Sequence, residues 1–115
     1  MKDFTPEQIA EMHDYNENFV GRTADFEKIQ QHREIKEGLV DLMGTCEYVR
    51  KVEEIKPIQY EQNALVYVDL RHPAVLNKVS AETLSELIGM ADSVVIACDA
   101  DNIRISFATE KVWKE

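Results

Sequence analysis

Five consecutive apolar residues, 94–98, lead directly into the polar tetrad 99–102, and this junction restricts the fold most strongly. Such a run cannot alternate between core and solvent, so it predicts a strand that is buried on both faces and lies inside a sheet. A second continuous apolar run, 64–68, predicts another interior strand. Two strands of this kind need cover on both faces, which helices or a second subunit must supply.

Three stretches carry apolar residues at helical spacing. A first helix is expected over residues 5–21 and a second over 23–45, with Thr23 as the N-cap of the second. A third helix is expected over 80–91, where Ser80 is a suitable N-cap and a buried stripe follows it. The third helix would connect the two interior strands.

The remaining segments read as strands with at least one exposed side. Residues 46–60 mix apolar and charged side chains and are interrupted by Pro57, which indicates one or two strands at an edge or a bend. Ile103, Ile105 and Phe107 alternate with smaller or polar residues, as expected for a strand with one solvated face. Because residues 99–102 have turn chemistry, the last two strands should form a hairpin.

Together these elements predict a single domain over 1–115 of the α+β class, or a small α/β domain. A helical part with two N-terminal helices, 1–45, would be followed by a β-β-α-β-β part, 46–115. We expect a four-stranded mixed sheet that contains a parallel, right-handed β-α-β unit and ends in the C-terminal β-hairpin.

Composition excludes several classes of function. The chain has 115 residues and a net charge of −9 without a basic cluster, so direct nucleic-acid binding is not expected. No stretch approaches the roughly 20 apolar residues of a membrane span. Cys46 and Cys98 fit no zinc or disulfide pattern and are expected to be reduced, buried thiols in a cytoplasmic protein.

One group of side chains could carry chemistry. If the interior strands are parallel, their carboxyl ends share one sheet edge, which brings Asp69, Arg71 and His72 near Asp99 and Asp101. Clustered carboxylates suit Mg²⁺ or Mn²⁺, which bind substrate phosphates in many enzymes, and a histidine is suited to general-base catalysis. Asp and Asn are also the commonest turn residues, so the tetrad can equally be a simple turn.

Standard catalytic motifs, including the Gly-rich nucleotide loops and the nucleophile elbow, are absent from the sequence. The leading hypothesis is therefore a small acidic binding or regulatory module, typical of bacterial or phage proteins. It would work through protein–protein contacts, without catalysis or cofactor, and is a possible homodimer. Glu7, Glu11 and Asp14, on the polar face of the first helix, are the candidate partner-binding residues. The alternative is an Mg²⁺- or Mn²⁺-dependent site for a phosphate ester, built from Asp69, His72, Asp99 and Asp101.

Overall fold

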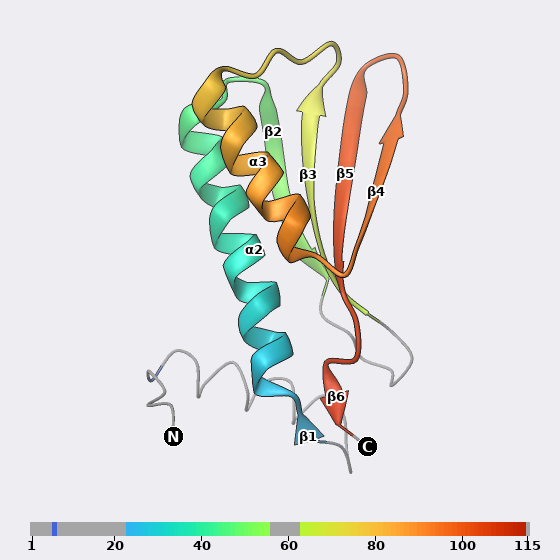
Figure 1. The fold of residues 1–115 in the computed structure, drawn as a ribbon. Coiled ribbons are helices and arrows are strands. Elements are labelled where there is room, and N and C mark those ends of the chain that lie inside the picture. The colour runs from blue at the N-terminus through green and yellow to red at the C-terminus, as the bar shows by residue number, and fades with distance from the viewer. Residues whose placement is uncertain (1–5, 7–22, 56–62, 115) are drawn as a thin grey trace.

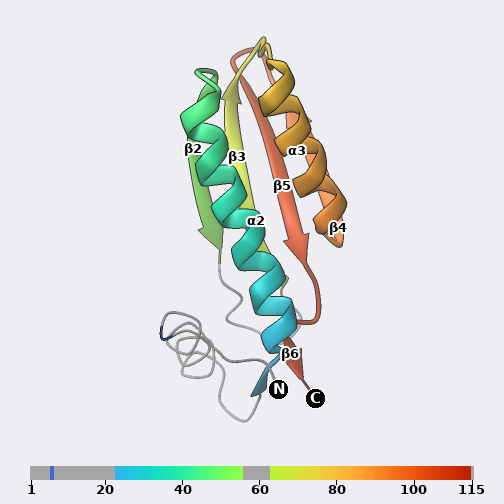
Figure 2. The same ribbon diagram turned by 60° about the vertical axis from the view of Figure 1, so that its left-hand side comes forward.

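The computed structural model of the chain describes Pro6 and residues 23–55 and 63–114. Its main body is a four-stranded sheet with two helices against one face (Figures 1 and 2). A short pairing of β1 with β6 forms a second, two-stranded sheet. In chain order the elements are β1 (Thr23–Ala24), α2 (Phe26–Thr45), β2 (Val49–Ile55), β3 (Ala64–Arg71), α3 (Lys78–Met90), β4 (Ser93–Cys98), β5 (Asn102–Thr109) and β6 (Trp113–Lys114).

The four-stranded sheet has the order β2-β3-β5-β4, and every neighbouring pair is antiparallel. The α+β class, the four strands and the C-terminal hairpin are thus confirmed, whereas the prediction of a mixed sheet is wrong. The reason is that β5 folds back from the turn after β4 and inserts between β3 and β4. Strands β3 and β4, which precede and follow α3 in the chain, still run in the same direction, but they are not hydrogen-bonded to each other.

The helices begin at different residues from those predicted. Helix α2 is capped by Asp25, not Thr23, because the Asp25 carboxylate accepts hydrogen bonds from the backbone N–H groups of Glu27 and Lys28. Helix α3 is capped by Asn77, whose side chain accepts from the N–H of Ser80, so Ser80 lies inside the first turn. The first helix, predicted over 5–21, lies outside the described residues apart from Pro6.

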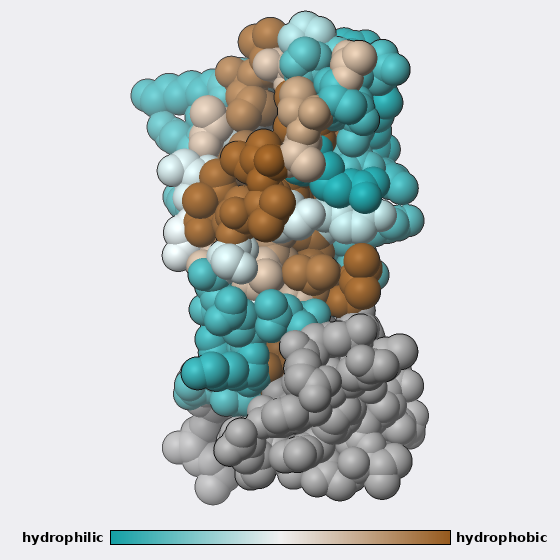
Figure 3. Space-filling model, turned by 90° about the vertical axis from the view of Figure 1, so that its right-hand side faces the viewer, coloured by the Kyte–Doolittle hydropathy of each residue, from teal (hydrophilic) through white to brown (hydrophobic). Residues whose placement is uncertain are grey.

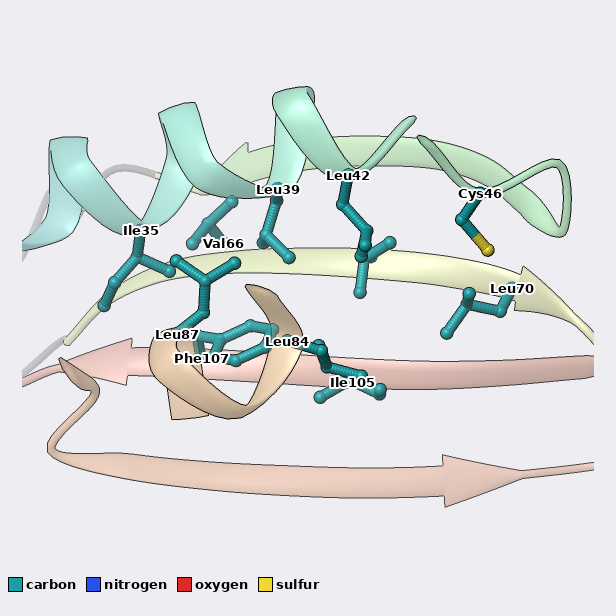
Figure 4. Close-up of a cluster of buried hydrophobic side chains, with 11 residues drawn as sticks. Ile35, Leu39, Leu42, Cys46, Val66, Leu70, Leu84, Leu87, Ile105 and Phe107 are labelled. Carbon is teal, nitrogen blue, oxygen red and sulfur yellow. The ribbon is translucent and has the colours of Figure 1, made fainter. Parts of the chain in front are cut away.

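The core fills the space between the two helices and one face of the sheet (Figure 4). Gly38 of α2 permits close approach of α3, since a Cβ atom there would lie only 2.4 Å from Cδ2 of Leu87. The core side chains are Ile35, Leu39 and Leu42 of α2, Cys46 after it, Leu84 and Leu87 of α3, Val66, Val68 and Leu70 of β3, and Ile105 and Phe107 of β5.

The main body consists of two successive units with the same order of elements. The first unit is α2-β2-β3 and the second is α3-β4-β5. Their second strands, β3 and β5, pair at the centre of the sheet, and their first strands, β2 and β4, form its two edges. Each unit therefore contributes one covering helix, one inner strand and one edge strand.

Strand β4 is not an interior strand, and the prediction that it is buried on both faces is wrong. Val95 and Ile96 each expose 63 % of their surface, and Cys98 is exposed as well. The position of β4 explains this exposure, because only β5 pairs with it among the described strands. Strand β3, which has the same apolar pattern, does lie inside the sheet as predicted.

None of the helices in the described ranges is long and apolar enough to cross a membrane.

Candidate functional site

The end of the sheet where β3 and β4 terminate brings together most of the residues that the sequence singled out. The backbone N–H of His72 donates to the carbonyl oxygen of Asp101 over 3.1 Å, which joins the segment after β3 to the turn after β4. The His72–Pro73 peptide bond is cis. The predicted proximity of residues 71–72 and 99–102 thus holds, even though β5 separates the two strands (Figure 1).

Asp99 is a turn-forming residue in this structure. Its Oδ1 accepts hydrogen bonds from the backbone N–H groups of Asp101 at 2.8 Å and Asn102 at 2.7 Å. These two bonds stabilise the charged carboxylate and lower the pKa of Asp99. The Asp101 side chain is exposed in the same turn. The Asp99 carboxylate and the Asp101 backbone N–H therefore help to close the β4–β5 hairpin, and this role requires no metal ion.

Asp69 lies on the sheet face opposite the helices and forms a bidentate ion pair with Arg104. Its two oxygens accept from Nε and Nη2 of Arg104 at 2.7 and 2.9 Å. Residues 69 and 104 are directly opposite in the β3–β5 register, which fixes this geometry. The hydrogen bonds from Arg104 outweigh burial and lower the pKa of Asp69. The carboxylate thus already has a strongly bound cation of its own.

This ion pair belongs to a polar network on the open face of the sheet. The Arg104 guanidinium lies 4.1 Å from the ring centroid of Tyr67, and the Tyr67 hydroxyl donates to Glu53. Nζ of Lys51 lies 4.0 Å from Oδ2 of Asp69. Among the described residues, no group of three or more His, Cys, Asp or Glu side chains is placed to hold a metal ion. The Mg²⁺ or Mn²⁺ site built on Asp69, His72, Asp99 and Asp101 stays a prediction, and the engaged carboxylates of Asp69 and Asp99 do not favour it.

Two pockets lie near this end of the molecule. One, of about 360 Å³, is beside the β4–β5 hairpin and is lined by Ala97, Cys98, Asp99, Asn102 and Arg104. The other, of about 390 Å³, separates the end of α2 from the start of α3 and is lined by Thr45, Cys46, Glu47, Tyr48, Val75, Asn77 and Ser80. In the second pocket the Ser80 hydroxyl is committed to the Thr45 carbonyl oxygen at 3.1 Å. Neither lining combines a nucleophile with a hydrogen-bonded base.

The most distinctive surface is the exposed edge formed by β4. Its residues, Ser93-Val94-Val95-Ile96-Ala97-Cys98, include no charge and no proline. Ile88 of α3, the helix that precedes β4 in the chain, is also apolar and is 40 % exposed. Figure 3, viewed from the β4 side, shows apolar residues gathered across the middle of this surface. An edge strand exposes backbone N–H and C=O groups that can pair with another strand.

The opposite edge, β2, has a different chemistry. It contains Arg50, Lys51, Glu53 and Glu54, and its register with β3 shifts between Val49 and Lys51. Glu54 accepts from Nε2 of the buried His32 at 2.6 Å and from Nζ of Lys36 at 3.2 Å. Charged side chains and an irregular register both hinder the addition of another strand.

The remaining sequence predictions have separate outcomes. Glu7, Glu11 and Asp14 lie outside the described residues. Cys46 is a buried free thiol as expected, but Cys98 is an exposed one because β4 is an edge strand. Sequence reasoning missed the apolar edge at Val95 and Ile96. The turn at 99–102 could have indicated this edge. A tight turn implies that β4 pairs with β5 on one side, and nothing in the sequence implies a strand on its other side.

Comparison of the chain with protein-family models, with curated proteins and with solved structures finds no match in any of the three.

Proposed function

We propose that this chain is a protein-binding module without catalysis and that its binding surface is the β4 edge. The observation that carries the proposal is the exposed strand Ser93–Cys98, which pairs with β5 without a register shift and contains no charged residue. Extended segments of other proteins bind such edges by adding a strand. Main-chain hydrogen bonds then supply affinity, and alternate side chains supply specificity.

The side chains around β4 support this assignment. Val95 points to the open face of the sheet and Ile96 to the helix face, because successive residues of a strand alternate. Both are 63 % exposed, so an added strand would be flanked by apolar side chains on both faces. Exposed apolar side chains gathered around one edge, as Figure 3 shows, are typical of an interaction surface.

The hydrogen bonds of Asp69 and Asp99 also favour a binding function over metal-dependent catalysis. Asp69 is neutralised by Arg104, and Asp99 holds the hairpin turn. Both oxygens of Asp69 are used by Arg104, and Oδ1 of Asp99 accepts two backbone hydrogen bonds, so these carboxylates already have roles in the fold. The second hypothesis, metal-dependent chemistry on a phosphate ester, therefore has less support in the geometry.

Affinity capture with matched variants tests this function. Wild type, Ile96→Lys and Ile55→Lys are immobilised and exposed to an extract of the source cells, and the retained proteins are quantified by mass spectrometry. Ile55, at the end of β2, is 49 % exposed and provides the control for adding one lysine to an edge strand. We expect proteins that bind wild type and Ile55→Lys but not Ile96→Lys. Equal capture by all three baits would contradict the proposal.

A further inference from the structure

We propose that β4 pairs with β4 of a second copy of this chain, in antiparallel orientation about a two-fold axis perpendicular to the sheet. This inference rests on the proposed function, because it uses the same edge and names its occupant. The two four-stranded sheets would join into one continuous eight-stranded sheet, with the helices of both copies on the same face. The inference follows from the backbone pattern, the charge distribution and the exposed apolar side chains.

The hydrogen-bonding pattern of the hairpin determines which backbone groups are available. The N–H of Asp99 donates to the carbonyl of Asn102 at 2.9 Å, so residues 99 and 102 form a hydrogen-bonded pair. Residues 97 and 95 follow at alternate positions, opposite Arg104 and Ser106, and direct their backbone groups at β5. Val94, Ile96 and Cys98 consequently direct their N–H and C=O groups outward. These outward groups are the donors and acceptors for the second copy.

Symmetry then restricts the register. A two-fold axis perpendicular to the sheet requires opposite residues to point to the same face. The axis must therefore lie midway between the two copies of a single residue, and not level with the bond between two consecutive residues. An axis at Ile96 pairs the largest part of β4 using the outward groups. Ile96 would face its own equivalent, and Val94 would face Cys98 of the second copy. All these side chains are uncharged, so no like charges are opposed inside the strand.

Charge explains why a second copy would choose this edge. Each chain has a net charge of −9, so two copies repel each other over most of their surfaces. The β4 strand itself carries none of that charge. At one end Asp92 pairs with Lys28 at 2.9 Å and accepts from the N–H of Glu110 at 2.8 Å, while at the other end Asp99 keeps its charge in the turn beyond the strand. Close approach along the β4 strand therefore meets less repulsion than approach over the charged surfaces.

The exposed side chains supply the favourable contact. Ile96 would meet its equivalent beside the axis on the helix face, and Val95 would lie opposite Ala97 of the second copy on the open face. Ile96 and Val95 are each 63 % exposed in the single chain. Because one six-residue strand makes a small interface, we expect an affinity on the order of micromolar. Pairing would also make β4 an inner strand of the larger sheet, which accounts for its continuous apolar run.

Sedimentation equilibrium of the full chain tests the dimer. We expect wild type and Ile55→Lys to pass from monomer to dimer as the concentration rises, and Ile96→Lys to stay monomeric, with its dissociation constant raised at least 100-fold. Circular dichroism confirms that each variant is folded. A wild type that is monomeric at millimolar concentration overturns the inference, as does an Ile96→Lys variant that dimerises like wild type. If wild type is monomeric but capture from the extract still depends on Ile96, the proposed function stands and only the second copy is excluded.

Disulfide trapping tests the register. In the register centred on Ile96, Cys98 lies opposite residue 94 of the second copy, at about 5.5 Å between Cα atoms, which a disulfide can span. Val94→Cys should therefore give a covalent dimer under mild oxidation through its native Cys98. The double variant Val94→Cys/Cys98→Ser and the wild type, which has Cys98 alone on this strand, should not. Covalent dimers of wild type in the same yield would overturn the register.

Discussion

The two edges of the sheet occupy equivalent positions in successive α-β-β units, yet they have opposite surface chemistry. Strand β2 carries four charged residues and an irregular register, and its Glu54 is anchored to α2 through His32 and Lys36. Strand β4 carries no charge, has an uninterrupted register with β5, and exposes Val95 and Ile96. Natural sheets usually protect their edges from pairing. Within the described part of the chain, the β2 edge is protected and the β4 edge has no strand beside it, so the β4 edge is suited to a partner strand.

Substitutions in inner strands should lower the free energy of unfolding far more than substitutions in edge strands. Phe107 of β5 is fully buried, whereas Val95 of β4 is 63 % exposed. We expect Phe107→Ala to lower the free energy of unfolding by about 3–5 kcal/mol, because it leaves a cavity in the core. Val95→Ala should cost less than about 0.5 kcal/mol in the dilute monomer. Urea denaturation at low protein concentration measures both, and similar losses for the two variants would refute the edge position of β4.

Glu54, which anchors β2 to α2, should make the stability of the fold depend on pH. Burial alone would raise the pKa of Glu54, but the hydrogen bond and charge of His32 and the charge of Lys36 outweigh it and lower the pKa from 4.5 to about 2. Glu54 therefore stabilises the fold above pH 4.5, and this contribution is lost as the pH falls toward 2. Between pH 7 and pH 3 the loss should be about 2 kcal/mol.

Urea denaturation of wild type and Glu54→Gln at pH 7 and pH 3 isolates this contribution. Wild type should lose about 2 kcal/mol more than the variant over that interval, because the glutamine cannot titrate. An equal loss in both proteins would show that the Glu54 contacts with His32 and Lys36 do not anchor β2 to α2.

A third experiment makes β2 resemble β4. Lys51 and Glu53 are side chains of β2 that are about half exposed. Replacing both with valine should provide a second bare edge, so that copies joined at β4 can also join at β2 and grow beyond the dimer. Light scattering should then increase with concentration beyond the value of a dimer. Adding Ile96→Lys to the double variant should restrict growth to small oligomers, and unrestricted growth in that triple variant would contradict the role of β4.

The smallest effect is expected for metal ions. Thermal unfolding of wild type and Asp99→Asn in Mg²⁺ or Mn²⁺ distinguishes a metal site from a turn, because a ligand that binds only the folded state raises the melting temperature. We expect changes below about 1 °C that are equal in the two proteins. A rise of several degrees in wild type alone would support the hypothesis of a metal-dependent enzyme over that of a binding module.

Sequence patterns identified the type of most described elements but not their neighbours. The apolar runs of β3 and β4 look alike, and only the former is enclosed within the single chain, because the order of strands is set by how the β4–β5 hairpin docks onto β3. Asp69 illustrates the same limit. Its position at a strand end suggested a ligand, but Arg104 lies directly opposite it, and that pairing exists only because β5 is adjacent to β3. By contrast, the charges and proline of residues 46–60 correctly indicated an edge, since exposure to water is visible in local composition.

Residue-resolved hydrogen exchange of the β4 amides shows whether a strand binds at this edge. We expect the outward amides of Val94, Ile96 and Cys98 to exchange quickly in dilute protein and to become protected as the concentration rises, or when a captured partner is added. The inward amides of Val95 and Ala97 should be protected throughout by β5. Outward amides that exchange equally fast under all these conditions would show that the β4 edge binds no strand.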